Sequence, residues 1–288
     1  MSTLAGPVPA RAPEPVAAVV PAVVRTPTGH VQPVATRRVL RSEWVKLRSL
    51  RSTAWTLLVA VVLMIGLGWL AGWDINATWS EHSPQEQATF SAVDGTLGGF
   101  YLAQLAVAVL GVLLVTGEYA TGMVRATFAA VPRRLPVLWA KATLFAVVTF
   151  ALMLVAAVVA FVGGQEFLGE HGTTLGRAGV VRGILGVSAY LSVVAVLAVA
   201  VGFIIRSTAG GVATMCGLLL VAPTAGLLLP ASWRGHLLPY LPSNAGAAVF
   251  RALPAPDSLT ADAGAVVLGV WLLVAVAAAA LSLRRRDV

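Results

Sequence analysis

Six long apolar runs, separated by short polar segments, dominate the chain after residue 50. The runs cover residues 54–73, 97–116, 137–162, 179–205, 209–229 and 263–283. A helix of about 20 residues rises about 30 Å, which is the thickness of the hydrocarbon core of a bilayer. The pattern therefore predicts an all-α, polytopic membrane protein with six transmembrane helices.

A shorter amphipathic segment, residues 36–51, precedes the first run. At helical spacing its apolar residues fall on one side. They are Val39, Leu40, Trp44, Leu47 and Leu50. Basic residues, among them Lys46 and Arg48, occupy the other sides, so we expect an interfacial helix in the headgroup plane. Glu43 falls among the apolar residues. We expect it to form an ordinary surface pair with Lys46, and the alternative partner is a cation elsewhere in the fold.

A long polar interruption, residues 117–141, separates the second and third runs. Within it, residues 118–130 contain no proline and are long enough for about three helical turns, so we expect one rigid helix there. Gly122 weakens this helix and marks a candidate bend. Pro132 and Pro136 then set a sharp exit into the third run. On residue types alone, a plain loop with topology-setting cations is an equal alternative.

Two segments outside the runs also have a distinct character. Residues 1–35 are rich in Pro, Ala and Val without periodicity, which predicts a disordered cytoplasmic tail before one transmembrane domain at 36–288. Residues 237–253 are too apolar for a free loop. We expect a short interfacial or re-entrant helix there, capped by Ser243 or Asn244 and packed against the spans.

The composition fits a membrane protein. Of 288 residues, 58% are hydrophobic and only 11% are charged, whereas about a quarter of a soluble domain is charged. With alternating spans, all but four of the 20 lysines and arginines fall on the side of the termini. The four exceptions are Arg177, Arg182, Arg234 and Arg251. This asymmetry predicts a cell-membrane protein with both termini cytoplasmic. It also explains the net charge of +8, so we expect no nucleic-acid partner.

Catalytic and ion-coupling groups are sparse in the sequence. No Asp or Glu falls inside the six runs, and the four histidines lie in the tail or in outer loops. An ion-coupled transporter normally carries ionisable groups within its spans. The sequence contains no P-loop for a nucleotide, and Cys216 has no second cysteine with which to form a disulfide or a metal site. These observations argue against an enzyme and against a secondary transporter.

Two features inside the runs have more than one interpretation. Arg182, near the start of the fourth run, is expected to snorkel to the outer interface, and the alternative is that it lines an outer vestibule. In the fifth run, Gly210, Gly211 and Pro223 indicate a flexible or kinked helix, for which packing is the favoured cause and a moving gate the alternative.

Three stretches of the chain follow a recognisable pattern. They are SEWVKLRSLRSTAWTLL (42–58), GEYATGMVRATFAAVPRRLPVLWAK (117–141) and YLPSNAG (240–246). Together with six spans and inside termini, they resemble the membrane subunit of bacterial ABC-2-type transporters, particularly six-span permeases of high-GC Gram-positive bacteria. The second stretch is the most specific. The first is similar to the elbow helix that leads into span one of this family, and the likeness extends from about residue 36 to the C-terminus.

The resemblance implies a non-catalytic permease that pairs with a second copy or a homologous permease, and with cytosolic ATPase subunits. Residues 118–130 would be a cytoplasmic coupling helix between spans two and three, seated in the ATPase. The implied ATPase contacts are Glu118, Tyr119, Arg125, Thr127, Phe128, Arg133 and Arg134. The implied elbow-helix positions are Glu43, Trp44, Lys46 and Arg48.

The same resemblance bears on cofactors and cargo. ATP would be bound by the partner subunit, so the chain itself would hold no cofactor and no metal. The implied activity is export of a small amphipathic, drug-like or lipid-like substrate. The alternatives are an ion-coupled secondary transporter and a polytopic scaffold or sensor without an ATPase partner.

Overall fold

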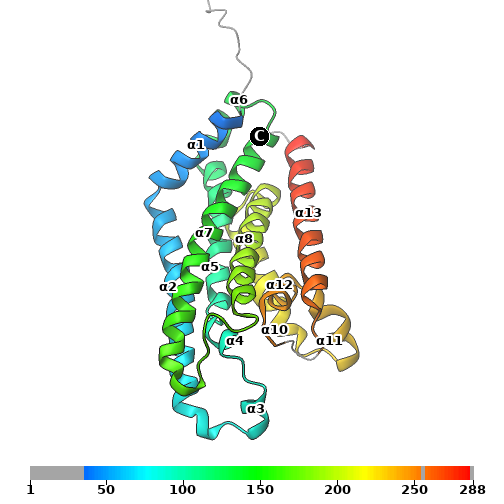
Figure 1. Ribbon diagram of the computed structural model, residues 1–288. Coiled ribbons are helices and arrows are strands. Elements are labelled where there is room, and N and C mark those ends of the chain that lie inside the picture. Colours follow the sequence, from blue (N-terminus) through cyan, green and yellow to red (C-terminus); the bar gives the residue numbers. More distant parts are fainter. Residues whose placement is uncertain (1–35, 254–256, 286–288) are drawn as a thin grey trace, which may run out of the picture. The chain divides into compact units, whose positions relative to one another are not determined.

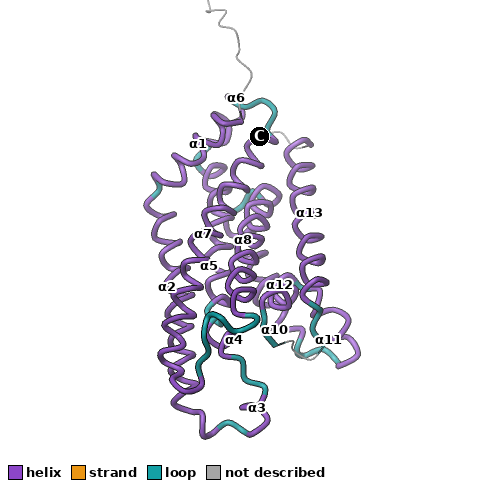
Figure 2. The backbone as a smooth tube through the Cα atoms, viewed as in Figure 1, coloured by secondary structure: helices purple, strands orange, loops and turns teal. Residues whose placement is uncertain are grey.

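The computed structural model describes residues 36–253 and 257–285, apart from the side chain of Ala231. Both ranges consist of helices and connecting loops, and no strand occurs among the described residues (Figures 1 and 2). The prediction of an all-α protein is confirmed. The tail that we predicted to be disordered, residues 1–35, lies outside the described residues.

Six helical segments of the described chain are long and apolar enough to cross a bilayer, which confirms the predicted number. They are α2 (Arg51–Thr78) with η1 (Trp79–Glu81), α4 (Ala92–Thr96) with α5 (Phe100–Ala120), α7 (Leu135–Leu168) with η2 (Gly169–His171), α8 (Val180–Ile205), the interrupted helix α9–η3–α10 (Thr208–Gly226), and α13 (Ala261–Arg285). The helices α2 and α7 contain 28 and 34 residues, so they extend past the apolar runs.

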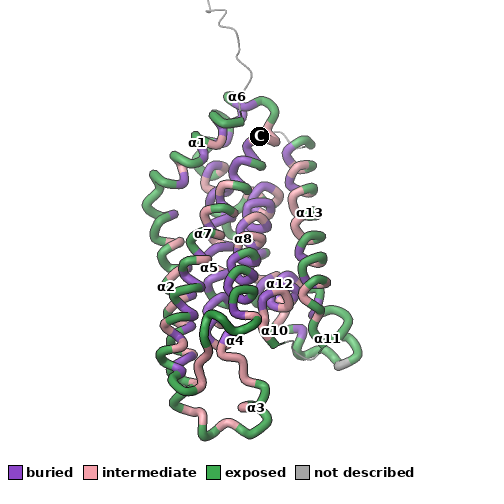
Figure 3. Tube along the Cα trace, in the orientation of Figure 1, coloured by how far each residue is buried: buried purple, intermediate pink, exposed green. Residues whose placement is uncertain are grey.

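Helix α8 forms the centre of the bundle. Most of its residues are buried, whereas few residues of α2 and α13 are buried (Figure 3). It packs against α5, α7, α13 and the short α12 (Pro242–Phe250). Small residues allow a close crossing, because a Cβ atom at Gly111 of α5 would lie 2.6 Å from the Cβ of Ala198 in α8. The exposed apolar faces of α2 and α13 suit contact with lipid.

The fifth span changes its helical geometry partway along. It begins as α9 (Thr208–Cys216), passes through a π-helical segment, η3 (Gly217–Val221), and ends as α10 (Ala222–Gly226). Pro223 lies two residues after the end of this segment and has no N–H to donate to the preceding turn. The N–H of Ala222 reaches Gly217 O, five residues back. The predicted irregularity is therefore present at η3, beside Pro223.

The helices end in two polar regions at opposite ends of the bundle (Figure 1). One region, the α6 end, contains α1 (Thr36–Ser49), α6 (Met123–Ala130) and the last turn of α13. The other, the α11 end, contains α3 (Pro84–Ala88), α11 (Ala231–Leu237) and α12. The four cations that the sequence separated from the rest belong to the α11 end.

The apolar segment at the α11 end forms α12, which packs against α8 and α13 as expected. The predicted cap is wrong, because the helix begins at Pro242 and its N-cap Leu241 makes no side-chain cap. Proline suits a first turn, where its missing N–H would have no partner anyway. Ser243 is therefore buried inside the helix, and Asn244 Nδ2 donates to Leu238 O at 2.8 Å.

Candidate functional site

One face of α1 is buried against the bundle. Its buried residues, Val39, Glu43 and Leu47, are four positions apart and so share a face of the helix. Trp44 and Arg48 are exposed on the other sides. Helix α1 packs against α7 and α2. The amphipathic helix is therefore present, and its acidic residue faces the bundle, while its position in the headgroup plane stays a prediction.

Four charged side chains meet between α1, α5 and α7. Lys141 Nζ donates to Glu43 Oε2 at 2.6 Å and to Glu118 Oε1 at 3.0 Å. Lys46 Nζ donates to Glu43 Oε1 at 2.8 Å and to Glu118 Oε1 at 2.9 Å. It also donates to the hydroxyl of Thr127 in α6 at 3.5 Å. We call Glu43, Lys46, Glu118 and Lys141 the charge cluster. Through Thr127 it connects four helices.

The charge cluster is buried and electrically balanced. Glu43 and Lys141 are each only 3% exposed, and Glu118 is 7% exposed. Removing such charges from water costs several kcal/mol per ion unless each one is paired. Two carboxylates and two ammonium groups satisfy that requirement. The cluster therefore favours one position of α1, because displacement of α1 would break the Lys46–Glu118 and Lys141–Glu43 ion pairs.

The pKa values of the two α1 residues reflect this pairing. Burial raises the pKa of Glu43, but attraction and hydrogen bonding by Lys141 and Lys46 outweigh it and hold the pKa below its ordinary value. Burial lowers the pKa of Lys46, but hydrogen bonds and charge attraction from Glu43 and Glu118 raise it above its ordinary value. Both side chains are therefore ionised near neutral pH.

The contact between Glu43 and Lys46 differs from the one that we expected. The two residues do form a pair, but Glu43 is buried and also binds Lys141 from a distant element. The interpretation as an ordinary surface pair is therefore wrong. The alternative, a pair with a cation elsewhere in the fold, is present, and the Lys141–Glu43 contact at 2.6 Å is shorter than the Lys46–Glu43 contact at 2.8 Å.

The segment expected to be one rigid helix, residues 118–130, is two helices. Glu118 and Tyr119 belong to the last turn of α5, and α6 begins at Met123. Gly122 separates them with a φ of 72°, a left-handed conformation that side chains with a Cβ rarely adopt. The N–H groups of Thr121 and Gly122 bond Gly117 O and Tyr119 O, which closes α5. The expectation of one rod is wrong, whereas the candidate bend at Gly122 is present.

Helix α6 has a buried face and an exposed face. Val124 and Phe128, one turn apart, are buried against the bundle, and half-buried Thr127 contacts Lys46. Met123 and Arg125 are exposed, as are Ala126, Ala129 and Ala130. The exposed face of α6 is thus formed mainly by small side chains, and it carries one cation, Arg125.

Two arginines connect this region to the end of α13. The Arg134 guanidinium lies 5.5 Å from the ring centre of Phe128 and donates to Leu283 O at 3.2 Å. The Arg206 guanidinium lies 5.3 Å from the ring centre of Tyr119 and donates to Ser282 O at 3.3 Å. Cation–π contacts of this kind stabilise by roughly 0.5–1 kcal/mol or more. The α6 end is therefore bound to the first three spans and to the last.

The structure unites most of the residues that the sequence predicted for this site. Glu43, Lys46, Glu118 and Thr127 meet at the charge cluster, and Tyr119, Phe128 and Arg134 lie in the arginine contacts. Trp44, Arg48, Arg125 and Arg133 are exposed, and no contact unites them with the cluster.

Sequence reasoning missed Lys141 and Arg206. Lys141 lies within the predicted third span, where a lone charge costs roughly 2.5–3.5 kcal/mol. Such a position signals a buried partner.

The side chains of this site connect helices and do not form a catalytic or metal-binding group. The charge cluster contains no nucleophile beside a base, and no group of His, Cys, Asp or Glu among the described residues could hold a metal ion. Its ion pairs join α1 to the ends of α5 and α7. Helix α6 is attached to this set through the hydrogen bond from Lys46 to Thr127 and through the buried side chains of Val124 and Phe128.

The sequence of the chain matches a known family of transporter proteins. A sequence profile described as ABC-2 family transporter protein matches residues 39–221, which is more than half of the chain. The match begins within α1, includes the charge cluster and α6, and ends with η3. No curated protein matches the sequence.

Proposed function

The chain belongs to the ABC-2 family of transporter proteins and is a multi-pass membrane subunit of an ABC transporter, and we propose that α6 is its coupling helix to a separate ATPase. In this proposal ATP is bound and hydrolysed by cytosolic partner subunits, and the chain itself holds no cofactor. The exposed face of α6 sits on the ATPase, and the charge cluster passes the movement to the spans.

The observation that carries this proposal is the connection of α6 to other helices. Its outer face is exposed, whereas Val124 and Phe128 anchor its inner face. Thr127 contacts Lys46, whose ammonium binds carboxylates on both α1 and α5. Helix α6 is therefore connected to α1 directly, and to α5 through Lys46, which is more than a simple loop between two spans requires.

The remaining parts of the proposal follow from the transporter family and the charge distribution. The α6 end, which carries most of the cations, faces the cytoplasm of the cell, and both termini lie on that side. The chain acts with a second copy or with a homologous permease. The cargo is a small amphipathic, drug-like or lipid-like molecule that is exported.

A second candidate function is ion-coupled secondary transport, and a third is a scaffold or sensor. The helices are longer than the apolar runs, so Glu118 and Asp94 fall within the second span. Acidic residues within a span favour ion coupling, whereas the apolar runs of the sequence contained none. However, Glu118 binds two ammonium groups, and both Asp94 oxygens accept from the N–H groups of Ala252 and Leu253. Both carboxylates are therefore engaged by donors within the protein.

The test is purification of the tagged full chain from membranes in mild detergent, with ATPase activity measured in the eluate. We expect an ATP-binding subunit to co-elute. Replacing Met123–Ala130 with a Gly/Ser segment of equal length should abolish its recovery. The matched control replaces Pro84–Ala88 of α3, at the opposite end, in the same way and should retain the ATPase. Recovery of the chain alone, or equal loss in both variants, would contradict the proposal.

A further inference from the structure

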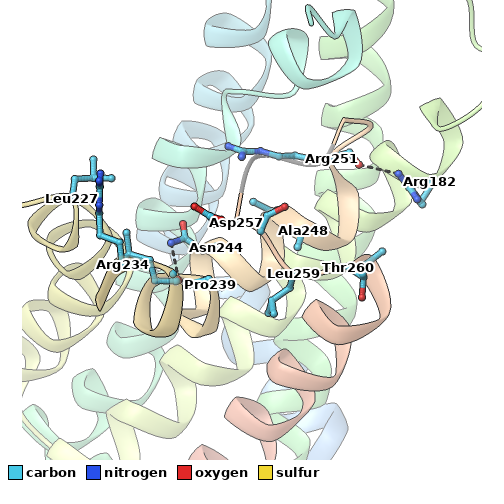
Figure 4. Close-up of a pocket in the computed structure, with 15 residues that line it drawn as sticks. Arg182, Leu227, Arg234, Pro239, Asn244, Ala248, Arg251, Asp257, Leu259 and Thr260 are labelled. Carbon is cyan, nitrogen blue, oxygen red and sulfur yellow. Dashed lines mark hydrogen bonds between the residues drawn. The ribbon is translucent and has the colours of Figure 1, made fainter. Parts of the chain in front are cut away.

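A pocket of about 420 Å³ lies at the α11 end, far along the chain from the charge cluster. Its size falls within the range of roughly 300–1,000 Å³ that is usual for small-molecule sites. Three arginines line it from three elements: Arg182 from the first turn of α8, Arg234 from α11, and Arg251 from the end of α12 (Figure 4). The pocket has a strongly basic wall on an otherwise acidic end.

The concentration of arginine in this pocket is selective. The α11 end has four cations, and three of them line the pocket, whereas Arg177 does not. The same end carries most of the acids, of which only Asp257 lines the pocket. The lining is therefore net positive by two charges. Within the described part of the chain, none of the three arginines makes an ion pair with a carboxylate.

Two of the arginines are held in position by the protein. Arg182 Nη2 donates to Arg251 O at 2.9 Å, and Arg251 Nη2 donates to the hydroxyl of Tyr101 at 2.7 Å. These bonds use part of each guanidinium and leave further N–H groups for a ligand, since a guanidinium has five donors. The donor geometry of arginine matches phosphate and carboxylate oxygens. A fixed cationic wall of this kind favours an anionic group.

Apart from the charged residues, the lining combines polar side chains, such as Asn244 and Thr260, with apolar ones. Leu227, Leu238 and Leu259 line the pocket. Beside it, Leu228 is 88% exposed and Trp233 of α11 is 61% exposed. A tryptophan and leucines next to an arginine are typical of a segment at the membrane–water interface. A ligand with its charge on the arginines could extend its hydrocarbon chain over these residues.

We propose that this pocket binds the anionic headgroup of an amphiphile, with phosphate or carboxylate oxygens on Arg182, Arg234 and Arg251. The inference deepens the proposed function and rests on it for the role of the site, because the amphiphile is either the cargo or a lipid of the surrounding bilayer. Binding of the headgroup itself requires this chain alone and no ATPase partner. The carboxylate of Asp257 repels the anionic headgroup and so lowers the affinity of the pocket for it.

The direct test is binding of a long-chain alkyl phosphate to the purified full chain in a neutral alkyl maltoside, by calorimetric titration. We expect saturable binding that weakens about tenfold in Arg234→Gln, the loss of one charge-assisted contact. Asp257→Asn should strengthen it. The matched control, Arg177→Gln, removes the same charge from the same end outside the pocket and should bind as the wild type does. Equal weakening in Arg177→Gln, or no binding by the wild type, would overturn the proposal.

Two further experiments distinguish a bilayer lipid from a transported cargo as the ligand. In nanodiscs, phosphatidylglycerol added to phosphatidylcholine should compete with the alkyl phosphate if the site takes a bilayer lipid. If the ligand is cargo, the alkyl phosphate should instead stimulate ATPase activity of the co-purified complex, and Arg234→Gln should remove the stimulation. An uncharged alcohol of equal chain length that bound as well would overturn the headgroup assignment. Because titration uses the chain alone, its failure is distinguishable from failure of the ATPase partnership.

Discussion

At the scale of single residues, the charge cluster is the feature with the largest energetic consequences. Its four members come from three separate helices, yet every carboxylate faces an ammonium group within 3.0 Å. Ion pairs at this depth add little stability compared with apolar packing, but loss of one partner leaves an uncompensated charge. The cluster is therefore a device that fixes geometry, and its substitutions should be costly and interdependent.

The first prediction concerns that interdependence. Glu43→Gln should lower the free energy of unfolding in detergent by about 3 kcal/mol, because Lys46 and Lys141 would share one carboxylate. Lys141→Gln should cost a similar amount. The double variant should lose less than the sum by about 1–3 kcal/mol. Thermal unfolding of the four proteins measures this cycle. Arg48→Gln, exposed on the same helix, is the control and should change little. Strictly additive losses would show that the two side chains do not interact.

The second prediction concerns pH. The pKa of Glu43 is below its ordinary value in the folded protein, so its contribution to stability is present above the ordinary glutamate pKa and is lost as pH falls through the folded value. The pKa of Lys46 is raised, so its contribution is present below the ordinary lysine pKa and is lost as pH rises through the folded value. Unfolding temperature should therefore fall at both extremes of pH. Glu43→Gln should flatten the acidic fall, and an unchanged acidic profile in that variant would refute the assignment.

At the scale of elements, the break between α5 and α6 depends on one residue. Gly122 has a φ of 72°, and a Cβ there would meet nothing within 4 Å, so an added methyl group would strain only the backbone. Gly122→Ala should destabilise by about 1–2 kcal/mol and reduce coupling of ATPase activity by moving α6. Gly117→Ala is the matched control, because Gly117 is helical and equally open. It should stabilise by roughly 0.5–1 kcal/mol. Both are measured by thermal unfolding and by ATPase assay of the complex.

The elements differ in how far the sequence could predict them. The six spans follow from the length of the apolar runs and α1 follows from hydrophobic periodicity, and both signals depend only on neighbouring residues. The break between α5 and α6 at Gly122 and the start of α12 at Pro242 depend on the local backbone conformation. At each place the sequence offers more than one residue at which a helix could begin or end. The charge cluster depends on how α1 packs against α7. A lysine at position 141 signals a need for a partner but does not say which helix supplies it.

At the scale of the whole molecule, two helices contact both functional regions. Helix α8 carries Arg182 of the arginine-lined pocket near its start and is followed directly by Arg206 at the α6 end. Helix α13 begins at Ala261 in the pocket lining, and near its other end Leu283 O accepts from Arg134. A movement of α6 therefore has a short route through Arg134 and Arg206 to the helices that form the pocket. This arrangement places the proposed ATPase contact and the proposed ligand site at opposite ends of shared helices.

The last prediction tests which end meets the ATPase. Arg125 is exposed on α6 and no contact unites it with the cluster, so Arg125→Glu should leave the unfolding temperature unchanged. If α6 docks onto a partner, reversal of its one exposed cation should weaken co-purification of the ATPase several-fold. Added salt should reduce the difference from wild type, since exposed charges are screened. Arg177→Glu makes the same reversal at the α11 end and should recover the ATPase fully. If Arg177→Glu lost the partner and Arg125→Glu kept it, the orientation of the chain in the membrane would have to be reversed.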